Sequence, residues 1–216
     1  MRKIPFISGS FYHIYAHTVS DILLFQDNND QKRFLNILFL ANSESSLPRL
    51  DRAHDLNLVW DARDGKLNLG QPLVQIIAFC LMPNHFHFLL GEGKDGNISK
   101  FMHKILVSFS KYTNLKYERR GHLFESNFHS KPLEDNNYLL RASCYIHLNP
   151  KDISNWNNQE ENYFWSSYAD YVKENRWGNL LSRDIIMSQF ENDQSAYQKF
   201  VEETRPEVSD LDTELP

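Results

Sequence analysis

Cysteine is scarce in this sequence of 216 residues, which holds Cys80 and Cys144 and no CxxC pair. Two isolated thiols exclude a disulfide-stapled scaffold and a zinc site built from paired cysteines, and they predict a reduced, cytoplasmic protein. Long apolar runs are lacking too, because no stretch approaches the roughly 20 residues of a membrane span. The opening stretch MRKIPFISGS has no apolar core of a secretory signal. The sequence therefore predicts neither a membrane anchor nor an export signal.

The excess of positive charge that is typical of nucleic-acid-binding domains is also lacking, since the net charge is −5. Residues 152–216 hold 14 acidic and 5 basic residues, a net of −9, whereas residues 1–151 hold 14 and 18, a net of +4. Basic residues concentrate in residues 97–133, and six of them are candidate DNA contacts: Lys104, Lys111, Lys116, Arg119, Arg120 and Lys131. This mildly basic body is compatible with a phosphate-rich partner, and an ordinary solvated face is the alternative.

The spacing of apolar residues predicts an α+β protein. Alternation or continuous apolar runs indicate strands at 9–19, 73–82 and 85–92, and residues 121–133 are strand or loop. Apolar residues three and four apart indicate helices at 27–42, with Asp30 as the N-cap, at 97–117 and at 134–149. The order strand, helix, two strands, helix, strand, helix predicts a ferredoxin-like or RRM-like antiparallel sheet with helices on one face.

The hydrophobic content of 41% is enough for one packed core, so we expect one main domain over residues 1–172. Within it, residues 48–72 form an insertion, which the turn signal Asp64-Gly65 predicts to be hairpin-like. Residues 173–204 are expected to form a C-terminal helical extension. The acidic residues 205–216 are expected to be a disordered tail.

The stretch CLMPNHFHFLL, residues 80–90, places two histidines in a strand-like run. Residues i and i+2 of a strand share a face, so His85 and His87 project together while Phe86 and Phe88 point into the core. Two neutral imidazoles on one face can hold a divalent metal ion. The alternative is a pair of surface histidines on a half-exposed strand.

The stretch YIHLNP adds Tyr145 and Asn149, which are four residues apart and therefore share one face of a helix. The Asn149 side-chain oxygen could join His85 and His87 as a ligand of Mg²⁺ or Mn²⁺, with coordination sites left for water and a phosphate oxygen. Tyr145 beside such a metal ion is equipped to attack phosphorus. In the alternative reading, Tyr145 packs against the sheet and Asn149 caps the helix.

Other tyrosines compete for the role of nucleophile. Tyr112 and Tyr117 lie on the long amphipathic helix, where Tyr112 falls on the apolar face. Tyr138 shares the helix of Tyr145 but has no amide residue one turn later. These contrasts favour Tyr145.

Five stretches of the chain resemble, in the same order, the HUH-type single-tyrosine transposases of small bacterial insertion sequences, and above all the REP-associated tyrosine transposases. They cover roughly residues 11–172 and read YHIYAHTV, FCLMPNHFHFLL, KYTNLKYERRGHLFES, YIHLNP and FWSSYADYV. The combination of MPNHFHFLL with YIHLNP some sixty residues later is far more specific than either motif alone.

The resemblance implies a metal-dependent single-stranded DNA endonuclease and strand transferase that acts at DNA hairpins. His85 and His87 match the family's metal-binding histidines, and Asn149 falls where the family supplies a polar third ligand. Tyr145 matches the nucleophile, which becomes joined to a 5′ phosphate and frees a 3′ hydroxyl. The implied partner is single-stranded or hairpin DNA in the bacterial nucleoid, and the resemblance favours a monomer, with a homodimer as the alternative.

Two positions depart from the family pattern: Asn127 stands where relatives usually carry arginine, and Ala16 where asparagine is common. The loss of an arginine removes an expected phosphate contact. Two other functions therefore stay open at this stage. One is a domesticated protein that binds structured DNA or RNA without cleaving it, and the other is a metal-dependent hydrolase of small phosphoesters.

Overall fold

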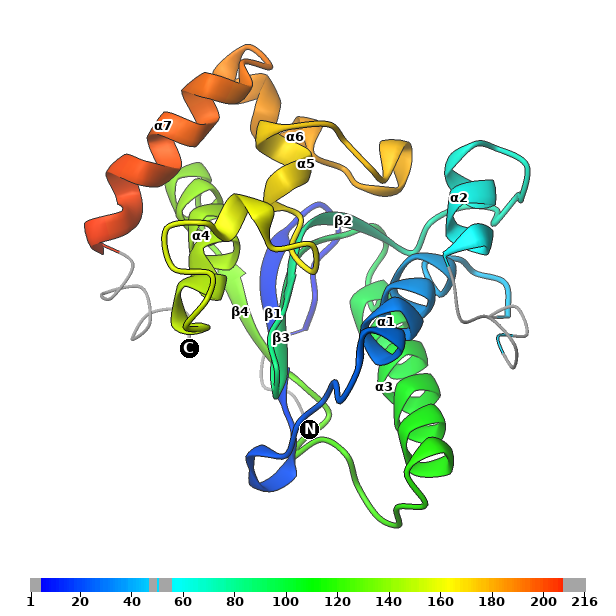
Figure 1. Ribbon diagram of the computed structural model, residues 1–216. Helices are drawn as coiled ribbons and strands as arrows, with labels where there is room; N and C mark the ends of the chain where they lie inside the picture. The colour runs from blue at the N-terminus through cyan, green and yellow to red at the C-terminus, as the bar shows by residue number, and fades with distance from the viewer. Residues whose placement is uncertain (1–4, 47–49, 51–55, 208–216) are drawn as a thin grey trace.

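The computed structural model describes residues 5–46, 50 and 56–207, and a four-stranded sheet forms its centre (Figure 1). The strands are β1 (Phe11–His17), β2 (Val74–Leu81), β3 (His85–Glu92) and β4 (His129–Leu133). The helices are α1 (Asn28–Leu40), α2 (Asn57–Arg63), α3 (Asn97–Lys116), α4 (Asn136–Leu148), α5 (Tyr168–Val172), α6 (Asp184–Met187) and α7 (Gln194–Thr204). Short 3-10 turns join them, including η1 (Val19–Asp21) after β1 and η2 (Asn149–Asp152) after α4.

The sheet has the order β2-β3-β1-β4, and each neighbouring pair is antiparallel. The chain order β1, α1, β2, β3, α3, β4 with this strand order is that of a ferredoxin-like sheet. The predicted α+β fold class is therefore confirmed.

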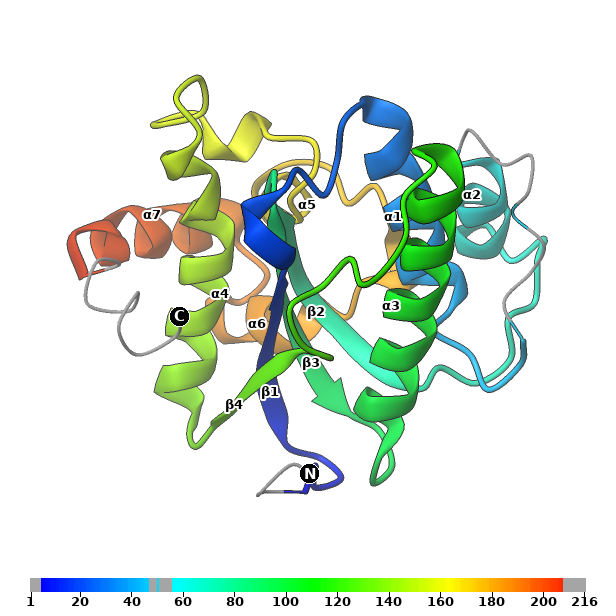
Figure 2. The same ribbon diagram turned by 90° about the horizontal axis from the view of Figure 1, so that it is seen from below.

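Alternation along β1 and β3 gives the sheet two different faces. One face packs under α1 and α3, where Phe86 and Phe88 lie 5.2 and 6.2 Å, ring centre to ring centre, from Phe34 of α1. The opposite face carries the odd-numbered residues of both strands and lies under α4 (Figure 2). The two helices of the ferredoxin-like unit thus share one face, and the later helix α4 covers the other.

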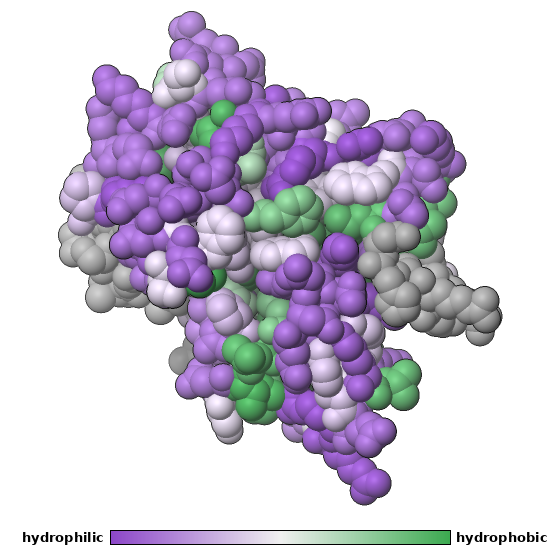
Figure 3. All heavy atoms as spheres, in the orientation of Figure 1, coloured by the Kyte–Doolittle hydropathy of each residue, from purple (hydrophilic) through white to green (hydrophobic). Residues whose placement is uncertain are grey.

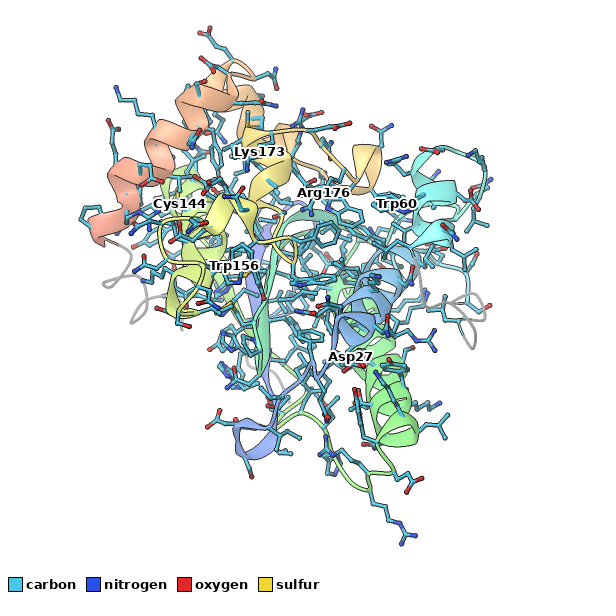
Figure 4. The ribbon with its side chains drawn as sticks, in the orientation of Figure 1. Asp27, Trp60, Cys144, Trp156, Lys173 and Arg176 are labelled. Carbon is cyan, nitrogen blue, oxygen red and sulfur yellow. The ribbon has the colours of Figure 1, made fainter. Side chains whose placement is uncertain are left out.

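The N-cap of helix α1 lies one turn earlier than the predicted N-cap Asp30. Asp27 is the N-cap, since its carboxylate accepts hydrogen bonds from the backbone N–H groups of Asn29 and Asp30, and the predicted N-cap Asp30 is the third helical residue. The Asp30 carboxylate accepts in return from the N–H of Asp27, which completes a capping box. Asp30 is also 1% exposed and binds the side chains of Tyr112 and Lys116, so it fastens α1 to α3. Figure 4 labels Asp27 at this junction.

The predicted hairpin around Asp64-Gly65 is wrong, because residues 57–63 form helix α2. The Asp-Gly pair ends this helix: Gly65 has a φ of +73°, its N–H donates to the Ala62 carbonyl, and the N–H of Lys66 donates to Asp61. These two bonds make a Schellman C-cap, which has the same glycine signal as a hairpin turn. Tertiary packing selects the helix, since Trp60 stacks on Trp177 with ring centres 5.0 Å apart. The preceding residues 48, 49 and 51–55 of the insertion lie outside the described residues.

Residues 173–204 contain α6, α7 and short 3-10 turns, and α7 packs on α4 through a buried polar group. The His147 imidazole of α4 is 2.7 Å from the hydroxyl of Tyr197 and 2.9 Å from that of Ser167. Ser167 accepts in turn from the backbone N–H of Phe79 in β2, so α4 is tied to both the sheet and α7. Arg205, the first residue of the predicted disordered tail, pairs with the buried Glu160 at 2.8 Å, and residues 208–216 of that predicted tail lie outside the described part.

We expect His147 to make the fold sensitive to acid. Burial lowers the pKa of His147 to about 3, while an unfolded histidine has a pKa of about 6.5. The unfolded state therefore takes up the proton first as the pH falls from 6.5 towards 3, and the free energy of unfolding decreases over that range. Between pH 7 and 5 this one group should cost about 2 kcal/mol. Urea unfolding in EDTA should show a smaller decrease for His147→Gln than for the wild type, and equal decreases would contradict the assignment.

The surface is mostly hydrophilic on the face shown in Figure 3, with small separate apolar patches. Among the described residues, the large exposed apolar side chains are Ile7, Leu23, Val107, Leu115 and Phe164. In the same part of the chain, none of the helices combines the length and the apolar character that crossing a bilayer requires.

Candidate active site

Four histidines meet on the sheet face that α4 covers. His85 and His87 point to this face from β3, as the alternation predicts, and the antiparallel register places His17 of β1 opposite His85. His13 lies four residues before His17, on the same face of β1. His13 and His17 are not among the residues predicted from the sequence, although the alternation in HIYAH is the same signal as in HFH. Only the pairing of β1 with β3 shows that the two motifs are neighbours.

The imidazoles contact one another in pairs. His13 Nε2 is 2.9 Å from His87 Nδ1, and the two rings are within 10° of coplanar orientation. The rings of His17 and His85 stack with centres 4.7 Å apart, while His85 and His87 meet edge to face at 4.8 Å. His13 and His87 are 0% and 2% exposed, so this pair is removed from water.

Helix α4 brings Tyr145 and Asn149 onto the same histidines. The Tyr145 ring lies edge-on against His87 at 5.4 Å and against His13 at 5.6 Å, and the residue is 5% exposed. One turn later, the Asn149 amide nitrogen donates to the Tyr145 carbonyl at 3.3 Å, and the Asn149 side chain lies beside His85. The structure thus brings together the four residues that the two motifs predicted.

The burial of these imidazoles keeps them neutral. Burial, together with the nearby His17, lowers the pKa of His85 to about 4, and the adjacent Asn149 amide opposes the shift. Burial also lowers the pKa of His87 well below its usual value, with His13 adding to the effect. Neutral imidazole is the form that binds a metal ion.

The donor set fits the divalent ion that the sequence predicts. The Asn149 amide nitrogen is engaged with the Tyr145 carbonyl, which leaves the amide oxygen as the atom available to a metal ion beside His85. Two neutral imidazoles and an amide oxygen suit Mg²⁺ or Mn²⁺ with open positions. Within the described residues, no three His, Cys, Asp or Glu side chains are grouped as ligands of one metal ion. The predicted set differs from such a group because its third ligand is an amide.

The competing tyrosines lie elsewhere or lack these neighbours. Tyr112 and Tyr117 donate to Asp30 between α1 and α3, and burial raises the pKa of Tyr112 to about 12. Tyr138 is half-buried on α4, about two turns before Tyr145. One competitor was missed: Tyr15 of β1 stacks with its ring 6.0 Å from that of His87, and burial raises its pKa.

The six predicted DNA contacts separate into three groups. Lys104 and Lys116 serve the fold, since Lys104 donates to the carbonyls of Ser43 and Ser45 after α1 and Lys116 pairs with Asp30 at 2.7 Å. Lys131 lies on the site face of β4, where its charge helps to lower the pKa of the buried His13. The remaining three are Lys111 and Arg120, which are exposed, and Arg119, which is half-buried.

Lys111 and Arg119 line a groove between α3 and β4, here called the α3–β4 groove. It has a volume of about 1480 Å³, and its walls come from the outer side of α3, residues 119–128, and β4. Asn127 lines it as well, at the position where relatives usually carry arginine. None of the four predicted site residues (His85, His87, Tyr145 and Asn149) lines this groove, so it is a separate surface of the described structure.

Comparison with known proteins agrees with the motifs. Residues 70–149, from just before β2 to the residue after α4, match the family described as "Transposase IS200 like". The solved structure of the REP-associated tyrosine transposase bound to a REP hairpin superposes with a TM-score of 0.50 over 80% of this chain and 84% of that chain, at 17% sequence identity. Among curated proteins, none matches the chain. The segment that holds His85, His87, Tyr145 and Asn149 therefore matches the IS200-like transposase family, in a chain whose fold is similar to that of a REP-associated tyrosine transposase.

Proposed function

We propose that this protein is a transposase-like endonuclease and strand transferase, which cleaves single-stranded DNA at or near hairpins with a divalent metal ion and Tyr145 as nucleophile. The meeting of Tyr145 and Asn149 with His85 and His87 carries the proposal. The match to the IS200-like family supports DNA transposition as the class of reaction. The hairpin bound by the structurally similar protein supports DNA hairpins as the partner.

In the proposed cleavage step, the Tyr145 Oη attacks the scissile phosphorus. The phenol gives up its proton, the Oη–P bond forms, and the bond from phosphorus to the 3′ oxygen breaks as that oxygen takes up a proton. The products are a 5′-phosphotyrosine and a free 3′ hydroxyl, so the reverse reaction with another 3′ hydroxyl joins strands. Helix α4 contributes by holding the phenol against His87 before DNA binds.

His85, His87 and Asn149 are the residues that would hold Mg²⁺ or Mn²⁺. Such an ion, when bound, neutralises charge on the phosphate during displacement. The protein contributes a dry setting, because His87 is 2% and Asn149 6% exposed. Electrostatic interactions are stronger in such an environment than in water.

The α3–β4 groove is our candidate for holding the DNA outside the active site. It lies on the α3 side of the sheet and borders β4, the edge strand, whose other face carries Lys131 opposite His13. A strand that leaves the groove and crosses this edge reaches the face of Tyr145. The groove therefore supplies phosphate contacts, while the site supplies the chemistry.

We expect charge reversal at Lys111 and Arg119 to weaken DNA binding to all sequences alike, because phosphate contacts carry no sequence information. Each lost contact should reduce the slope of log affinity against log salt by about 0.7 on single strands. Fluorescence anisotropy with hairpin and unstructured oligonucleotides over a range of KCl measures both effects. Lys199→Glu is the matched control, since Lys199 is 77% exposed on α7. If the DNA affinity of the wild type did not change with KCl concentration, the groove would be an ordinary solvated surface and not a phosphate-binding one.

We expect a monomer, because one chain supplies all four residues of the proposed site. Sedimentation velocity at micromolar protein should give a single species of 25.5 kDa. A tight dimer under these conditions would favour the alternative assembly.

The proposed function is tested by incubating the protein with labelled single-stranded hairpin oligonucleotides and Mn²⁺. We expect an adduct that survives denaturing electrophoresis. Hairpin binding without an adduct would favour the non-cleaving binder, and metal-dependent phosphoester hydrolysis that survives the loss of Tyr145 would favour the hydrolase.

A further inference from the structure

We propose that Asn84 and His13 are positioning residues that hold His85 and His87 by their Nδ1 atoms, so that the Nε2 atoms are the ones offered to a metal ion. The inference rests on the proposed metal site and specifies which nitrogens form it. Both histidines have their Nδ1 occupied by a neighbour: Asn84 Oδ1 lies 2.7 Å from His85 Nδ1, and His13 Nε2 lies 2.9 Å from His87 Nδ1.

On the His85 side, Asp21 decides the orientation of the Asn84 amide. The Asn84 nitrogen donates to an Asp21 carboxylate oxygen at 3.2 Å, which leaves the amide oxygen facing His85. An amide oxygen only accepts, so the proton of neutral His85 is on Nδ1 and the lone pair is on Nε2. Ligand histidines in metal sites are commonly fixed in this way by a hydrogen bond from the other ring nitrogen.

The backbone around Asp21 is specialised for this contact. Ser20 and Asp21 both adopt left-handed φ values, +54° and +53°, which cost conformational energy for residues other than glycine. The loop is anchored where it leaves β1, because the N–H of Thr18 donates to the Asn84 carbonyl at 3.0 Å. The strained turn thus holds the Asp21 carboxylate on Asn84, directly before the HxH motif.

On the His87 side, the neighbour is the imidazole of His13. Either His13 Nε2 or His87 Nδ1 can carry the shared proton, and the two placements differ in how well they satisfy the other ring nitrogens. His13 Nδ1 is buried and has no hydrogen-bond partner. A proton on that atom would be an unsatisfied buried donor, so His13 is better satisfied when it donates from Nε2 to His87 Nδ1. In the metal-free protein, the proton of His87 is therefore on Nε2.

Ligation through His87 Nε2 then requires the pair to reverse its hydrogen bond. The proton on His87 Nε2 is displaced, the proton on His13 Nε2 passes to His87 Nδ1, and His13 takes up one proton at Nδ1. Both rings are neutral before and after, and no net proton is released. His85 can bind a metal ion through Nε2 without any such proton shift. The two histidines of the motif therefore differ in whether metal binding requires a change of tautomer.

Nitrogen-15 NMR of the imidazoles tests this difference directly. In the metal-free protein we expect His85 to be protonated at Nδ1 and His87 at Nε2, and saturating Mg²⁺ should move the His87 proton to Nδ1. A His85 protonated at Nε2 in the metal-free protein, or a His87 tautomer that Mg²⁺ leaves at Nε2, would overturn the inference.

Mn²⁺ affinity, measured by electron paramagnetic resonance with the metal alone, gives the second test. Asn84→Ala and His13→Ala should each weaken binding about 10- to 100-fold, as the loss of a hydrogen bond to a ligand histidine does. His17→Ala is the control. The ring of His17 stacks on that of His85 with centres 4.7 Å apart, and no hydrogen bond between their ring nitrogens is described. We expect this variant to stay within about threefold of the wild type, since it leaves the orienting bonds in place.

His13 is 0% exposed, so His13→Gln accompanies the alanine variant. An amide both donates and accepts, and it should restore Mn²⁺ affinity to within about tenfold of the wild type if hydrogen bonding is the role of His13. If Asn84→Ala and His13→Ala both bind Mn²⁺ like the wild type, or if His13→Gln binds no better than His13→Ala, the positioning role is wrong. A wild-type protein that binds no Mn²⁺, or that keeps its affinity in His85→Ala, would instead refute the proposed metal site.

Discussion

Tyr145→Phe is expected to eliminate the covalent protein–DNA adduct and to reduce cleavage by about a thousandfold or more, because the substitution removes the attacking oxygen. A phenol with an ordinary pKa near 10 is a weak nucleophile at neutral pH, so it depends on position and on charge withdrawal from the phosphate. Tyr145 has both in the proposed site, since its ring contacts His87 and its helix carries Asn149. Phenylalanine keeps that ring packing, so folding and hairpin binding should be retained.

The controls come from the competing tyrosines. Tyr138→Phe on the same helix and Tyr15→Phe on the same sheet face should form the adduct at wild-type rates. Denaturing electrophoresis detects the adduct, and peptide mapping of the trapped species identifies its tyrosine. Attachment at Tyr15, Tyr112 or Tyr138, or full cleavage by Tyr145→Phe, would show that the nucleophile is another group.

His85→Ala and His87→Ala are each expected to reduce Mn²⁺-dependent cleavage by about a thousandfold, because each removes one of two imidazole ligands. His85 is the cleaner test, since it is only half-buried and its loss leaves a smaller defect in the fold than that of His87, which is 2% exposed. Asn149→Ala should weaken metal binding less, since a neutral amide is the poorest ligand of the three. Rates are compared at saturating DNA, so that changes in DNA affinity do not contribute.

Lys199→Ala is the control, because Lys199 is 77% exposed on α7 and does not line the α3–β4 groove. Its cleavage rate should equal that of the wild type. Wild-type cleavage that persists in excess EDTA would show that the reaction needs no divalent ion and that the neutral histidines have another role.

The network behind α4 explains how a helix can present a nucleophile accurately. His147 projects from α4 toward Ser167 and Tyr197, while Tyr145 contacts the histidines of the sheet. The C-terminal helices are therefore part of the support of the site. Figure 1 shows α7 lying beside α4 on the side away from α1 and α3.

The sequence by itself determined the features that depend on local periodicity. A strand places residues i and i+2 on one face, and a helix places residues i and i+4 on one face, so the pairs His85–His87 and Tyr145–Asn149 could be predicted without a fold. The order of strands and helices was also sufficient for the ferredoxin-like sheet, because few topologies accommodate that order.

Tertiary structure decided everything that depends on which distant segments meet. Asp64-Gly65 reads equally well as a hairpin turn and as a helix C-cap, and the stacking of Trp60 on Trp177 selected the cap. Lys104 and Lys116 are candidate DNA contacts in the sequence. In the structure, Lys104 binds the Ser43 carbonyl after α1 and Lys116 pairs with Asp30 of α1. His13 was uninformative in the sequence, since the pairing of β1 with β3 brings it to His87 across 74 residues. Local spacing is fixed by backbone geometry, whereas these contacts arise only when buried surfaces from separate elements pack together.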